Sequence, residues 1–161
     1  MPKPKYYPKW LRASLKSDKE HLFIDMDGVT CDFDGAKKAH VDGGGKPNDV
    51  FKMEGFFTDL PAIVGAIEAI QKLDKVYDVY MLSTAPWSSP NAWKEKRIWV
   101  ENYLGVDFKK KLILSHNKGL FKGRALIDDR VANGVLDFDG EHIHFGEEGF
   151  ETWDKVVEYL L

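Results

Sequence analysis

Two pairs of acidic residues in this chain each follow a short apolar run. Asp25 and Asp27 follow the first run, and Asp128 and Asp129 follow the second. Carboxylates that lie close together repel one another, and a divalent cation relieves that repulsion. Mg²⁺ is bound by few protein carboxylates and keeps room for phosphate and water. The two pairs therefore predict a magnesium site that handles phosphate groups.

Two further polar residues stand between these pairs in the sequence. Thr84 follows an apolar segment, and its hydroxyl, with nearby backbone amides, is able to donate to phosphate oxygens. Lys118 is predicted in a loop, where an ammonium group neutralises charge that develops on a transferring phosphoryl group. Alone, such residues are more often a turn cap and a solvated lysine. Their order between the two acidic pairs favours phosphoryl transfer.

The segment Asp25-Met26-Asp27-Gly28, taken alone, has two other interpretations. It is compatible with an acidic surface turn in which Gly28 supplies a positive φ. A calcium-binding loop begins in a similar way, but such a loop has Glu at its twelfth position, where this chain has Ala36. The calcium loop is thereby excluded, and the surface turn stays open.

The elements that must position these side chains follow from the apolar periodicity. Buried strands are predicted over residues 21–26, 76–82, 112–114, 125–127 and 142–145. One helix is predicted to begin at Pro61, with Ile63, Ile67, Ile70 and Leu73 buried. A second is predicted from Pro90 to Gly105, capped by Ser88 and Ser89, with Ala92, Trp99 and Tyr103 buried. A third is predicted over the apolar stripe Trp153, Val156, Val157, Leu160 and Leu161.

This alternation of strands and helices predicts an α/β fold, a Rossmann-like three-layer sandwich with a mostly parallel sheet covered on both faces. Such sheets bind ligands where the carboxyl ends of the strands meet. The acidic pairs and Thr84 all fall at predicted strand ends, so we expect them to share one crevice.

The chain of 161 residues suits one domain with a small insertion. Periodicity is lost over residues 34–57, where a glycine-rich stretch at 43–48 breaks the pattern. We expect residues 34–57 to form a partly helical cap over the strand ends. Residues 1–33 and 58–161 would form the core.

Composition excludes some functions. A net charge of −3 argues against a duplex nucleic-acid partner, because such binding neutralises many phosphates with clustered cations. No apolar stretch approaches the roughly 20 residues that span a bilayer, so no membrane insertion is expected. The single cysteine, Cys31, excludes an internal disulfide and fits a reducing compartment. The Lys- and Pro-rich N-terminus is interpreted as a basic arm and not a transit peptide, and a cytoplasmic location is expected.

An early acidic pair, a hydroxyl, a lysine and a late acidic pair, in this order, resemble the haloacid dehalogenase (HAD) superfamily of phosphatases. The resemblance runs from about Leu22 to Arg130. Within it the chain is similar to the 5′(3′)-deoxyribonucleotidase family. That closer likeness is carried by Asp25-Met26-Asp27-Gly28-Val29 with Asp32-Phe33, by Ser83-Thr84-Ala85-Pro86, by Glu95-Lys96-Arg97-Ile98-Trp99-Val100-Glu101 and by Leu126-Ile127-Asp128-Asp129.

The resemblance implies an enzyme that hydrolyses (deoxy)nucleoside monophosphates with Mg²⁺ through an aspartyl phosphate. Asp25 would be the nucleophile and a metal ligand, and Asp27 the general acid and base, with its backbone carbonyl on the metal. Thr84, Ala85 and Lys118 would hold phosphate oxygens, and Lys118 would also restrain the nucleophile. Asp129 would be a direct metal ligand and Asp128 an outer or alternative one.

The substrate pocket is expected near the insertion. Phe33, which matches the family, and Phe51 are predicted to form an apolar slot that stacks a nucleobase. Phe56 and Phe57 are expected instead to pack the cap onto the core. The insertion is short and glycine-rich, unlike the longer helical cap of animal members, so the preference for base and sugar stays open.

Three alternatives remain. One is a phosphatase of the same superfamily that acts on another small phosphate monoester or on a nucleic-acid 3′-phosphate. The second is a signalling receiver domain, which uses Asp, Mg²⁺, Thr and Lys, although there the acidic pair precedes the phosphorylated Asp. The third is a catalytically inactive binding domain on the same scaffold. The oligomeric state is not predicted.

Overall fold

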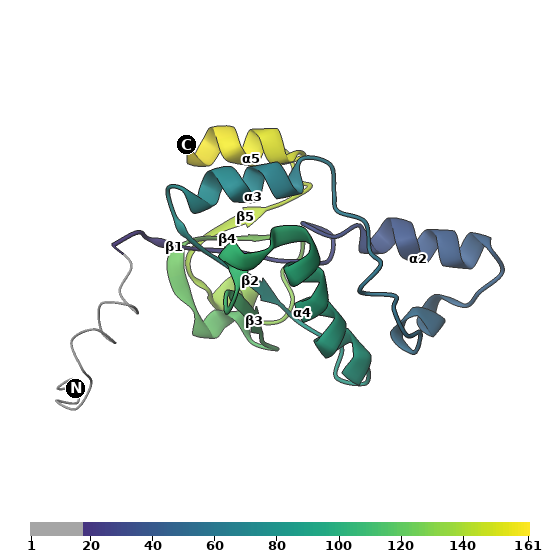
Figure 1. Ribbon diagram of the computed structural model, residues 1–161. Coiled ribbons are helices and arrows are strands. Elements are labelled where there is room, and N and C mark those ends of the chain that lie inside the picture. Colours follow the sequence, from purple (N-terminus) through teal and green to yellow (C-terminus); the bar gives the residue numbers. More distant parts are fainter. Residues whose placement is uncertain (1–17) are drawn as a thin grey trace, which may run out of the picture.

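The structure is a computed structural model, and it describes residues 18–161 (Figure 1). Most of the predicted basic N-terminal arm lies outside these residues. Among the described residues, none of the helices combines the length and apolar character that crossing a bilayer requires.

The described residues contain a five-stranded sheet in which all neighbouring strands are parallel, in the order β3-β2-β1-β4-β5. The strands are β1 (His21–Ile24), β2 (Asp78–Ser83), β3 (Leu112–Leu114), β4 (Lys122–Asp128) and β5 (Asp139–His144). Each matches a predicted strand to within a few residues, and the predicted α/β fold is confirmed. Because β1 lies between β2 and β4, the segments that follow these three strands meet at one edge.

Four α-helices accompany the sheet in the described residues: α2 (Phe33–Asp42), α3 (Ala66–Asp74), α4 (Pro90–Leu104) and α5 (Trp153–Leu160). Short 3₁₀ helices are η1 (Pro47–Phe51), η2 (Val106–Phe108), η3 (Lys118–Leu120) and η4 (Val135–Asp137).

Helix α4 has the ends that the sequence predicted. The Ser89 side chain accepts a hydrogen bond from Ala92 N, Pro90 begins the helix, and Gly105 ends it. Tyr103 was predicted to be buried, but 38% of it is exposed. Its ring stacks on buried Trp99, with centroids 4.3 Å apart, and so covers the core from outside.

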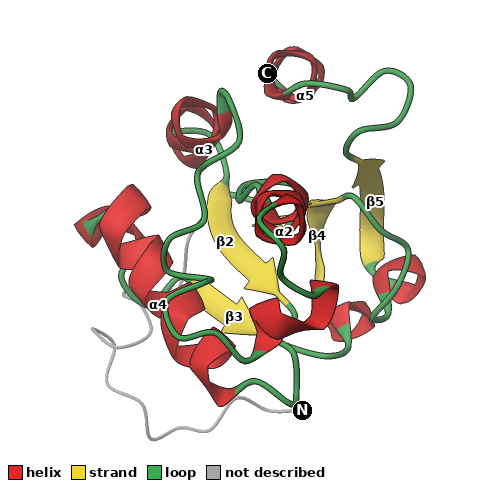
Figure 2. Cartoon of the chain, turned by 90° about the vertical axis from the view of Figure 1, so that its right-hand side faces the viewer, coloured by secondary structure: helices red, strands yellow, loops and turns green. Residues whose placement is uncertain are grey.

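The two faces of the sheet are covered differently (Figure 2). The buried apolar side chains of α3, α4 and α5 belong to one large cluster with Leu22 and Ile24. On the other face Phe23 and Leu126 pack with Val135 of η4 in a smaller cluster. The chain moves from β1 to β2 and β3 in one direction across the sheet and from β4 to β5 in the opposite direction. Because crossovers between parallel strands are right-handed, these two sets of connections cover opposite faces of the sheet. The connections around β4 are short, so 3₁₀ turns form that layer.

The prediction of a helix from Pro61 is wrong, because α3 begins only at Ala66. Pro61 and Ile63 instead lie along the loop after β1. Asp32 N donates to Pro61 O and Ile63 N donates to Thr30 O, both at 2.8 Å. Buried backbone groups in a loop need partners, and this extended segment supplies them.

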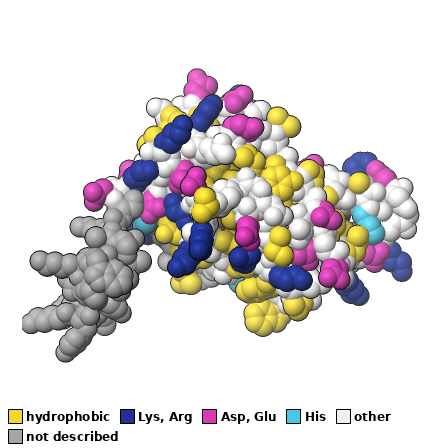
Figure 3. All heavy atoms as spheres, viewed as in Figure 1, with side chains coloured by type: hydrophobic (Ala, Val, Ile, Leu, Met, Phe, Trp, Pro, Cys, Tyr) yellow, Lys and Arg dark blue, Asp and Glu magenta, His cyan; other side chains and the backbone are white. Residues whose placement is uncertain are grey.

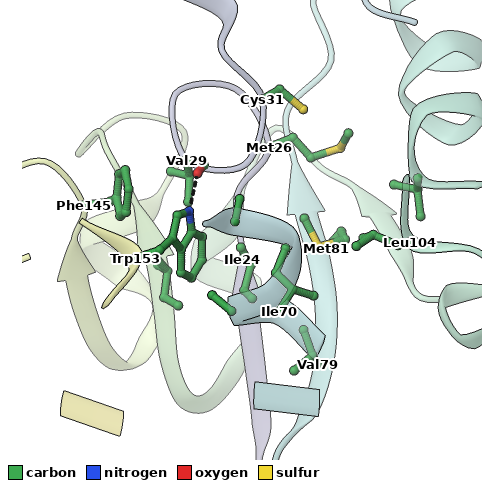
Figure 4. Packing of buried hydrophobic residues seen from close by; sticks show 14 of the residues in the cluster. Ile24, Met26, Val29, Cys31, Ile70, Val79, Met81, Leu104, Phe145 and Trp153 are labelled. Atoms are coloured by element: carbon green, nitrogen blue, oxygen red, sulfur yellow. Dashed lines mark hydrogen bonds between the residues drawn. The ribbon is translucent and has the colours of Figure 1, made fainter. Parts of the chain in front are cut away.

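A buried tryptophan also fixes the loop after β1. Trp153, the first residue of α5, donates from Nε1 to Val29 O at 2.8 Å among Ile24, Ile70 and Phe145 (Figure 4). The indole N–H is satisfied where its ring is buried. The end of the chain therefore holds the loop that follows the first strand.

Residues 34–57 contain most of α2 and all of η1. In Figure 1 both project to one side, away from α3 and α5. The glycine-rich stretch follows α2, where Gly43 N donates to Ala39 O and Gly44 N to Val41 O. On the face shown in Figure 3, acidic and basic side chains are interspersed, in keeping with the small net charge.

Candidate active site

A cavity of about 290 Å³ lies where the carboxyl ends of β1, β2 and β4 meet. Its wall on the side of the sheet includes Asp25, Asp27, Thr84, Lys118 and Asp128. Phe33 and Phe51 line it from the other side. These residues, widely separated in sequence, are thus brought together as predicted.

Lys118 links the two acidic segments. Its Nζ lies 2.9 Å from Asp25 Oδ1 and 2.5 Å from Asp128 Oδ2. The lysine is buried at the start of η3 and is not a solvated loop residue. Burial lowers the pKa of its ammonium group, but Asp25 and Asp128 outweigh this and the net pKa is raised. Lys118 is therefore a permanent cation between two carboxylates.

Asp25 is the most perturbed acid of the site. Burial raises its pKa to about 7; Lys118 opposes the rise, and Asp128 and Asp27 add to it. Thr30 Oγ1 donates to Asp25 O at 2.8 Å, and Asp25 N donates to Ile127 O at 2.9 Å. The backbone of Asp25 is thus fixed while its carboxylate faces the cavity.

The acids after β1 and β4 suit a divalent cation. Asp25, Asp128 and Asp129 each offer a carboxylate oxygen, and these atoms lie within 4.8 Å of one another. Both oxygens of Asp128 already have partners, Lys118 Nζ and Arg130 N. Asp129 Oδ1 is buried and has no hydrogen-bond partner among the described residues, which is costly unless a ligand satisfies it. An oxygen-only donor set with an unsatisfied buried oxygen fits Mg²⁺.

Two histidines that sequence reasoning missed hold the backbone of this acidic pair. His142 Nε2 lies 3.0 Å from Asp128 O, and His144 Nε2 lies 3.0 Å from Asp129 O. A carbonyl only accepts hydrogen bonds, so Nε2 carries the hydrogen in both rings. The rings stack with centroids 5.0 Å apart. The sequence signal was two histidines on the same face of one strand.

Lys96 is another residue that sequence reasoning missed. Its Nζ lies 2.8 Å from Asp27 Oδ2 and 3.0 Å from Ser83 Oγ, and its side chain is fully buried. Asp27 Oδ1 has no partner among the described residues. Lys96 lies between Ala92 and Trp99 at helical spacing, on the buried face of α4. A lysine on such a face needs an anionic partner, and that was the available signal.

Thr84 lines the cavity, but its hydroxyl already donates to Ser115 O at 2.7 Å. The side chain of Ala85 is fully buried, so only its backbone amide is left for a ligand.

The two predicted substrate-pocket rings lie against each other. Phe33 and Phe51 have centroids 6.1 Å apart and planes tilted by 32°, and Phe33 also packs against Phe56 and Phe57. This spacing leaves no room for a base between them. Phe33 is largely buried and Phe51 less so. The pair is therefore a wall of the cavity and not a slot.

The fold corresponds to a HAD-type α/β fold. A crystal structure of the HAD-hydrolase YfnB from Bacillus subtilis, bound to magnesium, superposes with a TM-score of 0.54 over 89% of this chain and 99% of that one. At 13% sequence identity this likeness shows the fold alone.

Sequence comparison then identifies the family. The family described as 5′ nucleotidase, deoxy (pyrimidine), cytosolic type C protein matches residues 48–152. A Vibrio phage KVP40 protein, assigned by name as a 5′(3′)-deoxyribonucleotidase, is 45% identical over 93% of this chain and 89% of its own. The human cytosolic 5′(3′)-deoxyribonucleotidase is 28% identical over 68% of this chain and 70% of its own. The chain belongs to this nucleotidase family.

Gly28 tests the contact between the two acidic segments. It has φ +80°, and a Cβ there would lie 2.2 Å from Asp129 Oδ2. We predict that Gly28→Ala displaces the Asp129 carboxylate and weakens Mg²⁺ binding about 10- to 100-fold, measured by calorimetry. Gly44→Ala is the matched control, since Gly44 has φ +99° but no atom within 4 Å of the added Cβ. Equal affinities in both variants would contradict the contact.

The raised pKa of Asp25 predicts a pH-dependent stability. Between its ordinary value of 3.8 and about 7, the folded protein keeps a proton that the unfolded chain releases, so stability falls as pH rises through that range. Without Mg²⁺, Asp25→Asn should raise the Tm at about pH 8 and raise it much less at about pH 5. Asp42→Asn, at an exposed acid, is the control. The same shift at both pH values would show that Asp25 titrates normally.

Proposed function

We propose that this protein is a Mg²⁺-dependent 5′(3′)-deoxyribonucleotidase that hydrolyses the phosphate ester of deoxynucleoside monophosphates. The observation that carries the proposal is the cluster in which Lys118 pairs with Asp25 and Asp128 at the cavity, with a carboxylate oxygen of Asp129 within 4.8 Å of theirs. Membership of the nucleotidase family and the names of the relatives support the substrate class. The cytosolic human relative supports a cytoplasmic location.

Asp25 is the proposed nucleophile. Lys118 holds Oδ1, while Oδ2 accepts no hydrogen bond from the described residues and is available to attack phosphorus. The Asp25 oxygen forms a bond to phosphorus as the bond from phosphorus to the sugar oxygen breaks, which leaves an aspartyl phosphate. A carboxylate and a phosphate dianion repel each other. Asp25, Asp129 and the Asp27 carbonyl would hold Mg²⁺, which would supply positive charge that offsets this repulsion.

Asp27 is the proposed general acid and base. Lys96 fixes Oδ2, so Oδ1, which has no partner in the described structure, is the oxygen that exchanges protons. It donates a proton to the leaving sugar oxygen. It then accepts one from the water that hydrolyses the aspartyl phosphate.

Phosphate oxygens would be held by Lys118, by the Ala85 amide and by Thr84. The Thr84 hydroxyl would first have to turn away from Ser115 O. We propose that residues 34–57 act as the cap and residues 1–33 and 58–161 as the core, with the base of the substrate resting against the wall formed by Phe33 and Phe51.

A substrate panel tests the function. We expect phosphate release from deoxynucleoside monophosphates to exceed that from simple sugar phosphates, and to stop when a chelator removes Mg²⁺.

Asp25→Asn should abolish turnover with the fold retained. Asp27→Asn should still form some phosphoenzyme, detected by acid quench, because the attack by Asp25 does not itself use Asp27, although the sugar oxygen then leaves without a proton from it and the water of the second step lacks its base. Normal activity of Asp25→Asn would exclude the mechanism, and a preference for sugar phosphates would exclude the substrate class.

Lys96 is expected to position Asp27. Lys96→Met frees the Asp27 carboxylate to rotate, so we predict that kcat falls about 10- to 100-fold while KM changes little. Arg97→Met is the matched control, because the adjacent Arg97 is exposed and pairs only with Glu101 on the surface. If the two variants had the same kcat, Asp27 would not depend on this ion pair.

A further inference from the structure

The insertion contributes one cation to the cavity. Lys37 of α2 lines it together with Phe33 and Phe51. Its Nζ lies 5.9 Å from the centroid of the Phe33 ring and 5.8 Å from that of Phe51. Phe33 is one helical turn before Lys37, so the helix places the ammonium group against both rings.

Lys37 differs from the other lysines at the site because it has no acidic partner. Lys118 pairs with Asp25 and Asp128, and Lys96 pairs with Asp27. Among residues 18–161, no ion pair joins Lys37 to an acid and its ammonium group lies over the two rings, whereas its neighbour Lys38 is exposed and pairs with Asp42. A partly buried ammonium group with no acceptor keeps its strongest donors available to a ligand.

The position of Lys37 restricts which part of a substrate it meets. A phosphate that reacts with Asp25 lies on the sheet side of the cavity, against Lys118. The rest of the molecule then extends toward the insertion, whose wall offers two aromatic rings and one ammonium group. A flat ring that carries a carbonyl oxygen satisfies both features, because its face packs on an aromatic ring and its oxygen accepts from the ammonium.

We propose that Lys37 binds a carbonyl oxygen of the substrate's nucleobase and so determines which bases the enzyme prefers. This rests on the proposed nucleotidase function. Uracil, thymine, cytosine and guanine carry such an oxygen and adenine does not. Lys37 is a specificity-determining residue, and the reaction at phosphorus does not require it.

The experiment compares Lys37→Met with Lys38→Met in the full chain. The kcat/KM is measured for deoxyuridine monophosphate, for deoxyadenosine monophosphate and for deoxyribose 5-phosphate, which has no base. The measured quantity is the kcat/KM for deoxyuridine monophosphate divided by the kcat/KM for deoxyribose 5-phosphate. In Lys37→Met this ratio should fall about 10- to 100-fold, as expected for the loss of a hydrogen bond to a charged group. The kcat/KM for deoxyadenosine monophosphate, divided by that for deoxyribose 5-phosphate, should fall much less. Lys38→Met should keep all the wild-type ratios, and Lys37→Arg, which keeps a donor, should recover part of the loss.

Two results would overturn the proposal. An equal fall in kcat/KM for all three compounds, including the one without a base, would mean that Lys37 acts on the phosphate. Wild-type kcat/KM values for all three compounds in Lys37→Met would mean that the ammonium group is only solvated. Failure of the nucleotidase function itself gives a different result, since the wild-type protein would then hydrolyse no deoxynucleoside monophosphate.

Discussion

The structure is organised around the repulsion between carboxylates that a parallel sheet brings to one edge. Asp25, Asp27, Asp128 and Asp129 follow adjacent strands, and two buried lysines, Lys96 and Lys118, are the cations directly bonded to them. When all four acids are ionised they outnumber the two ammonium groups by two, and one divalent cation would neutralise that difference. Burial is the main cause of the raised pKa of Asp25, and the neighbouring carboxylates of Asp128 and Asp27 raise it further.

Distant parts of the chain hold these acids in place. The loop after β1 is bonded to the extended segment at Pro61 and Ile63 and to Trp153 near the end of the chain. The loop after β4 is bonded through its carbonyls to His142 and His144. The two loops are thus fixed by separate elements, and the Asp129 carboxylate packs on the backbone at Gly28. A glycine is required there because any side chain would occupy the space of that carboxylate.

The sequence predicted the strands and the acidic residues at their ends together, because one pattern indicates both. A short apolar run that ends in Asp gives the strand and the edge at which it stops. Lys96 was missed because only apolar residues were counted on the buried face of α4, although a buried lysine is equally informative. The spacing of His142 and His144 placed them on one face of a strand, but their bonding to the carbonyls of the acidic pair was not predictable, since it depends on the register of β5 beside β4. At Pro61, proline suits an extended segment as well as the first turn of a helix, and only the partner loop decides between them.

Under the proposed function, the two sides of the cavity have separate tasks. The acids come from the strand ends and are held by Lys118 of η3, by Lys96 of α4 and by backbone hydrogen bonds. Lys37 and Phe51 come from residues 34–57, and no ion pair ties Lys37 to the described core. Substitutions in the insertion therefore change what is bound beside the phosphate and leave the charge balance of the acids intact. Relatives that differ mainly in this segment would share one chemistry and differ in the base that they accept.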